Sequence, residues 1–153
     1  MTQLRAYDYL VGVEASAQPD AGPPVLPNDL VTLSYLEAFS ERTQLVGSYA
    51  APEEIAAAVA IDPGIVDEKD VYLMFVTGDG GAQEMSANPP IVAPGRAGIE
   101  LTLVGVDPGG AGNTVTINNH ANVAQNGPVE LTDKSQITYK SLDATTWAEK
   151  SRQ

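Results

Sequence analysis

After Val71 the chain is a succession of short apolar stretches separated by turn residues, and this pattern restricts the fold more than any other feature. Residues 71–77 (VYLMFVT) form a mostly apolar run, which is typical of a strand buried on both faces. In residues 98–106 (GIELTLVGV) apolar and polar residues alternate, which predicts a strand with one inward face. The series of apolar residues then continues through Ile99, Leu101, Leu103, Val115, Ile117, Val123, Val129, Leu131, Ile137, Tyr139 and Trp147.

Turn residues divide this series into short strands. Turns or loops are expected at residues 78–81, 88–95, 107–110, 118–120, 126–127 and 132–134. Strands at a spacing of roughly 8–12 residues are typical of a small β-sandwich, jelly roll or barrel-like domain. We therefore predict a mainly β fold of this kind. Aromatic residues make up only 6% of the chain, so the core must be built largely from aliphatic side chains.

One short helix is predicted near residues 52–60, within the sequence APEEIAAAVA. Pro52 suits the first helical position, and the next two residues are glutamates, which favour the positive end of the helix dipole. Alanine is the best helix former, and residues 62–64 (DPG) would end the helix. Such a helix fits a close-packed contact between subunits, or a short surface helix packed on its own sheet.

The N-terminal part is harder to interpret. Residues 4–13 fit a strand, and residues 15–29 contain four prolines, which predicts a loop or an extended arm. Residues 30–39 (LVTLSYLEAF) fit both a helical stripe and a strand, and we favour a strand. The predicted organisation is an N-terminal strand and extended proline-rich arm over residues 1–29, followed by a β-rich domain over residues 30–153.

The charge of the chain restricts its partners. The formal net charge is -12, with 8 basic against 20 acidic residues, so direct contact with nucleic acid or with an anionic membrane is not expected. Residues 1–70 carry -9, whereas residues 113–153 are neutral. An acidic protein of this kind suits docking onto a more basic surface. No apolar stretch has the length of a secretion signal or a membrane span, so we expect a soluble protein made in the cytoplasm.

Residue types that support catalysis or metal binding are scarce. There is no cysteine, and the single histidine, His120, falls in an expected turn, where we predict an exposed side chain. A zinc site needs three or four suitable ligands, and a Ser-His-Asp triad would have to use His120. We predict that the protein is not an enzyme, with no catalytic, cofactor-binding or metal-binding residues.

Three further patterns are compatible with chemistry but have simpler explanations. The carboxylates Glu53-Glu54, Asp67-Glu68 and Asp70 could include a glycosidase pair, but solvated acidic surface explains them better. Residues 78–81 (GDGG) could supply oxygens to calcium, but they lack EF-hand spacing and fit a plain turn. The glycines between Gly105 and Gly112 lack the Lys-Ser/Thr of a phosphate-binding loop.

The last third of the chain carries an ordered set of motifs. NTVTI begins at Asn113, an Asn-Gly pair follows at Asn126, ITY begins at Ile137, and WAEKSR begins at Trp147. In this order the motifs resemble the C-terminal β-domain of tailed-bacteriophage virion proteins, and the resemblance covers residues 98–153. That domain commonly has Gly-Asp before the isoleucine strand and Asp-Gly in the last hairpin, where this chain has Lys134-Ser135 and Asp143-Ala144.

The resemblance implies a structural virion protein. Proteins with this domain are head decoration proteins, head fibres or tail-associated proteins, and they commonly form homotrimers. It implies here a viral capsid decoration or cement protein, which stabilises the bacteriophage head by binding between capsomers as a homotrimer. The expected partner is the major capsid protein or another virion protein, and the expected location is the outer capsid surface of the virion after synthesis in the host cytoplasm.

Alternatives to the cement role remain open. A head-fibre or tail-associated adaptor is possible, although no repeat or coiled coil is visible. A receptor- or carbohydrate-binding β-module is also compatible, although aromatic residues are scarce. A small sheet is marginal alone, so the strand at Trp147 must be covered by residues 1–97 or by neighbouring subunits.

Overall fold

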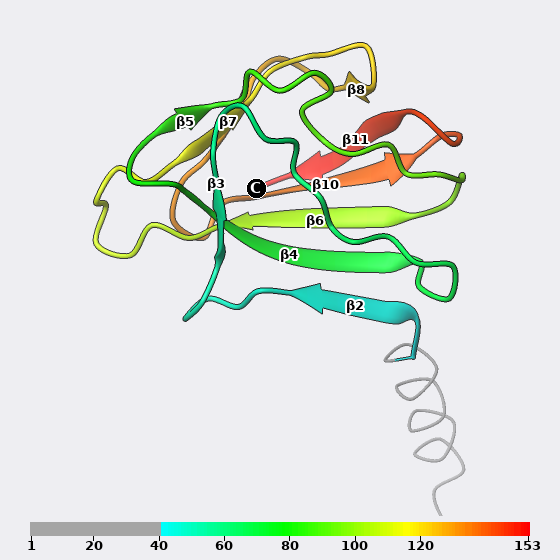
Figure 1. Cartoon of the computed structure of the whole chain (residues 1–153), viewed down its shortest axis with the longest axis horizontal. Coiled ribbons are helices and arrows are strands. Elements are labelled where there is room, and N and C mark those ends of the chain that lie inside the picture. Colours follow the sequence, from blue (N-terminus) through cyan, green and yellow to red (C-terminus); the bar gives the residue numbers. More distant parts are fainter. Residues whose placement is uncertain (1–40) are drawn as a thin grey trace, which may run out of the picture. The chain divides into compact units, whose positions relative to one another are not determined.

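The computed structural model describes residues 41–153, and residues 42–153 form one compact unit (Figure 1). The predicted strand at residues 4–13, the proline-rich arm and the predicted strand at residues 30–39 lie outside the described residues. The predicted boundary between residues 29 and 30 lies outside them too. All statements below concern the described unit.

A seven-stranded sheet forms the larger part of this unit. Its parallel part has the order β2 (Thr43–Val46), β4 (Val71–Gly78) and β6 (Glu100–Gly105), and β3 (Glu53–Ile55) also pairs with β4. The antiparallel strands β10 (Gln136–Ser141) and β11 (Trp147–Arg152) follow β6. The short strand β8 (Val123–Ala124) pairs in parallel with β11 and completes the sheet.

A second, three-stranded sheet lies beside the first (Figure 1). It contains β5 (Gln83–Glu84), β7 (Val115–Ile117) and β9 (Val129–Leu131), in that order. The mainly β fold predicted from the sequence is therefore confirmed. The parallel succession of β2, β4 and β6 is more typical of a solenoid than of a purely antiparallel sandwich.

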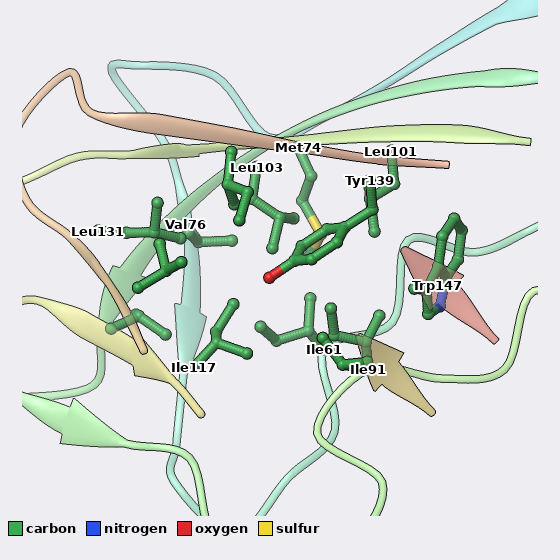
Figure 2. Close-up of a cluster of buried hydrophobic side chains, with 14 of the residues drawn as sticks. Ile61, Met74, Val76, Ile91, Leu101, Leu103, Ile117, Leu131, Tyr139 and Trp147 are labelled. Atoms are coloured by element: carbon green, nitrogen blue, oxygen red, sulfur yellow. The ribbon is translucent and has the colours of Figure 1, made fainter. Parts of the chain in front are cut away.

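Both sheets contribute to one core (Figure 2). Leu101, Leu103 and Tyr139 reach it from the large sheet, and Ile117 and Leu131 reach it from the small one. Ile61 and Ile91, which form an isolated parallel bridge outside the named strands, are also fully buried there. The inward residues that the alternating pattern predicted are all buried, from Ile99 to Trp147.

Strand β4 corrects one expectation. Its sequence predicted burial on both faces, but only alternate residues, Tyr72, Met74 and Val76, are buried among the large side chains. Val71, Leu73 and Phe75 point to the opposite face and remain half-buried. The strand therefore has a second apolar face that the rest of the described unit does not fully cover.

The prediction of a helix near residues 52–60 is wrong. Residues 53–55 instead form β3, which pairs in parallel with the end of β4, and a turn follows in which the Val59 N–H donates to the Ala56 carbonyl at 3.0 Å. An isolated helix of about ten residues is marginal in water. Here Ile55 is the only buried side chain between residues 51 and 60, so a helix would gain little from packing.

Trp147 is covered within the chain itself. It has no exposed surface, and its indole Nε1–H donates to the Val92 carbonyl at 2.9 Å. Its backbone N–H donates to the Asn122 carbonyl at 2.8 Å. Part of the segment up to residue 97 thus covers Trp147, in line with one of the two alternatives left open by the sequence.

Candidate functional site

A surface depression of about 440 Å³ lies where the segment between β7 and β9 meets β11. Most of its walls come from one continuous stretch of chain, and β11 adds a single carboxylate. Its lining residues are Asn119, His120, Val123, Ala124, Gln125, Asn126 and Glu149. Because this stretch contains only the two-residue strand β8, its shape depends on side-chain hydrogen bonds rather than on a sheet ladder.

Gln125 fixes the floor of the depression. Its side-chain Nε2 donates to the carbonyls of Ile117 at 2.7 Å and Gly127 at 2.9 Å, and its Oε1 accepts from the buried Tyr139 hydroxyl. The Asn119 side chain donates to the Gln125 carbonyl at 2.9 Å. Figure 2 shows the Tyr139 hydroxyl pointing into the space between the sheets. The floor is thus connected to the core through a buried polar network.

Replacing Tyr139 with phenylalanine is expected to lower the free energy of unfolding by about 1–3 kcal/mol, because the buried side-chain Oε1 of Gln125 loses its donor. Chemical denaturation of the variant and the parent measures this. Tyr49→Phe is the matched control, because the exposed Tyr49 hydroxyl also donates one hydrogen bond, to Asp133 at 2.7 Å. A loss at Tyr49 as large as that at Tyr139 would contradict the account.

Burial raises the pKa of Tyr139, and the nearby Glu149 carboxylate adds to this effect. The folded state therefore favours the neutral phenol. The resulting stabilisation is complete below the ordinary tyrosine pKa of about 10 and is lost as the pH rises above it. Above about pH 10, the free energy of unfolding of the Tyr139→Phe variant should therefore fall less than that of the parent. Chemical denaturation at alkaline pH would measure this.

Glu149 forms the wall on the β11 side, and Arg152 lies behind it as its ion-pair partner. The Glu149 carboxylate accepts from the Asn126 N–H at 2.9 Å and from the Arg152 guanidinium, whose Nε lies 3.1 Å from Oε1. Arg152 also donates to the carbonyls of Asn126 at 3.1 Å and Pro128 at 3.2 Å. This pair fastens the end of β11 to the loop before β9.

The Arg152 side chain and the Asn126 N–H lower the pKa of Glu149. A lowered folded pKa stabilises the fold above the ordinary glutamate pKa, and this contribution is lost as the pH falls through the folded pKa. We expect an NMR titration to give a Glu149 midpoint below that of an unperturbed glutamate. In an Arg152→Gln variant the midpoint should return toward the ordinary value. An ordinary midpoint in the parent would contradict the ion pair.

His120 is half-buried at the rim rather than exposed as predicted. It does lie at the expected turn, where its backbone exchanges hydrogen bonds with Val123 at 3.1 and 2.9 Å. Its Nδ1 lies 3.2 Å from Asn122 Oδ1, and the Asn122 side chain donates to the Ile91 carbonyl at 2.8 Å. The imidazole is therefore held in place beside the depression.

The carboxylate pairs lie outside the depression. Glu53 and Glu54 are exposed on β3, and Asp67 and Glu68 are exposed in a turn. Asp70 pairs with Arg42 and Arg96, the latter at 2.8 Å. Arg96 also donates to the carbonyls of Asp67 and Lys69 at 3.0 and 2.6 Å, so this ion pair holds the turn before β4.

The two glycine-rich segments form turns. Residues 78–81 turn as predicted, and the Asp79 N–H donates to the Ile55 carbonyl at 3.0 Å. In the loop after β6 the buried Asp107 carboxylate accepts from the backbone N–H groups of Gly112 at 3.0 Å and Asn113 at 3.1 Å. That loop therefore wraps around a carboxylate of its own chain.

Within residues 41–153 no group of three or more His, Asp or Glu residues is placed to hold a metal ion. No helix in this part of the chain is long and apolar enough to cross a membrane. The depression offers the Asn119 amide, the His120 imidazole and the Glu149 carboxylate beside two small apolar side chains. This arrangement is suited to hydrogen bonding a polar ligand.

Comparison with known proteins identifies no relative: no family model, no curated protein and no solved structure matches the chain.

Proposed function

We propose that this protein is a structural component of a tailed-bacteriophage virion. In this proposal it is a capsid decoration or cement protein that binds between capsomers on the outer capsid surface as a homotrimer. The observation that carries the proposal is the order of motifs in residues 98–153, which ends in the WAEKSR strand. Those residues supply β6 to β11, which contribute strands to both sheets of the described unit.

The organisation of the two sheets suits a cementing role. We propose that they form a small sandwich-like domain around their shared core, which is a rigid body for bridging neighbouring capsomers. The net charge of -12 favours docking on a more basic surface, and the major capsid protein or another virion protein would supply that surface. A protein that binds the assembled shell and not its dissociated subunits stabilises the shell by mass action.

Heads that lack this protein provide the test. We expect them to disrupt at a lower temperature than complete heads. Addition of the purified chain should raise their disruption temperature back to that of complete heads. Unrelated acidic protein at the same concentration serves as the control. If the purified chain neither sediments with heads nor changes their disruption temperature, the cement role is wrong.

A receptor-binding β-module or a head-fibre or tail-associated adaptor is the second candidate. The depression beside His120 favours it, because its polar groups could recognise a polar surface ligand. Under this alternative, Asn119→Ala together with His120→Ala should reduce adsorption of particles to host cells. The same changes should leave head stability unaffected. Normal adsorption of the double variant would remove this candidate.

A further inference from the structure

The large sheet has an outer face that points away from the shared core. In Figure 1 its strands β2, β4, β6 and β10 lie side by side. Because successive side chains alternate between the two faces, the register identifies the residues of this face. They are Thr43, Leu45, Val71, Leu73, Phe75, Thr77, Glu100, Thr102, Val104, Gln136, Thr138 and Lys140. All of them are half-buried or exposed.

One end of this outer face is apolar. Leu45 pairs with Leu73, and Phe75 pairs with Val104, in the register of neighbouring strands. Leu45 is 56% exposed. Parallel strands of this composition are normally covered on both faces. The outer face therefore has the character of a surface that another layer covers.

The outer face is also nearly neutral. On β6 and β10 its charged residues, Glu100 and Lys140, lie opposite each other in the register, and Glu100 is also paired with Lys150 of β11. At its edge β3 adds Glu54, which pairs with Thr77 of β4. The two negative and two positive charges cancel. The Thr102 and Thr138 hydroxyls are hydrogen bonded to each other at 2.9 Å, which lowers the cost of removing them from water. The chain as a whole carries -12.

This charge pattern indicates the partner. A basic partner would be attracted to the acidic surfaces elsewhere on the chain rather than to a neutral apolar patch. Two copies of the chain repel each other least where their charge is smallest, and the cores of protein interfaces are depleted in charged residues. We propose that the outer face is a self-association surface, covered by a second copy of this chain.

The inference adds a surface to the homotrimer in the proposed function and rests on no other part of it. Sedimentation velocity of the full chain over a range of concentrations is the test. Leu45→Lys should weaken self-association by about tenfold or more, because it places a charge on the apolar patch. Leu142→Lys is the matched control, because Leu142 is 60% exposed but lies outside the outer face, between β10 and β11.

Salt provides a second readout. Screening of the acidic surfaces should strengthen association through a neutral apolar face, whereas it would weaken an association between opposite charges. A parent chain that stays monomeric at high concentration and high salt would overturn the inference, and so would equal effects of the two lysine variants. The binding of heads by each variant is measured separately. A monomeric chain that still binds heads contradicts this inference and the homotrimer but not the cement role, whereas an associating chain that does not bind heads contradicts only the cement role.

Discussion

Trp147→Ala is expected to lower the free energy of unfolding by about 3–5 kcal/mol. The indole is fully buried, and its removal leaves a cavity and an unpaired Val92 carbonyl. For a unit of this size the midpoint of thermal unfolding should fall by roughly 10–20 °C. Far-UV circular dichroism during heating and chemical denaturation would measure both quantities.

Trp147→Phe separates the two contributions. Phenylalanine retains most of the apolar volume but cannot donate to Val92, so a smaller loss of about 1–3 kcal/mol is expected. If the alanine variant were as stable as the parent, Trp147 could not lie in the core. The segment around Val92 would then not cover the last strand.

Gly105→Ala is expected to have an effect of similar size for a different reason. A Cβ atom at this position would lie 2.1 Å from the Thr132 carbonyl oxygen and 2.9 Å from the Leu131 carbonyl carbon. Both are backbone atoms, so no side-chain rotation can relieve the contact. We expect a loss of about 3 kcal/mol or more in the free energy of unfolding.

Gly109→Ala is the matched control for this prediction. Gly109 has a φ of +81°, but a Cβ atom there would meet nothing within 4 Å. Its cost should come from backbone conformation alone, at about 1–2 kcal/mol. Chemical denaturation of both variants would compare them, and a Gly105 variant no less stable than the Gly109 variant would contradict the close approach of β6 to the end of β9.

The strands after Val71 were predictable because their signal is local. Alternation in residues 98–106 and 113–118 places apolar side chains on one face, and the structure buries Ile99, Leu101 and Ile117. The apolar run of β4 was misleading in one respect. An apolar composition on both faces indicates that both faces can be buried. It does not show whether the layer that buries each face is part of the same folded unit.

The prediction of a helix near residues 52–60 failed because strand pairing with β4 outweighed the local helix propensity. Residues 53–55 extend the pairing along β4, where the backbone gains ladder hydrogen bonds and Ile55 gains burial. Pro52 is equally compatible with the start of an edge strand. The alanine side chains that favoured a helix are small, so a helix packed on the sheet through them would bury little apolar surface.

The floor of the depression could not have been read from the sequence. Gln125 and Tyr139 are 14 residues apart, and nothing in either local pattern indicates their hydrogen bond. Asp107 gave a partial signal, because aspartate at the start of a Pro-Gly-Gly turn commonly accepts nearby backbone N–H groups. His120 was correctly placed at a turn, but its half-buried state beside Asn122 was not predicted.

The number of copies of this chain in each virion tests the central claim most directly. Quantitative mass spectrometry of purified particles, calibrated on the major capsid protein, would give this number. The account predicts that the chain is part of the particle in hundreds of copies, as a cement protein on the capsid lattice requires. A few copies would move it to a tail or fibre position, and its absence from purified particles would contradict a structural role in the virion.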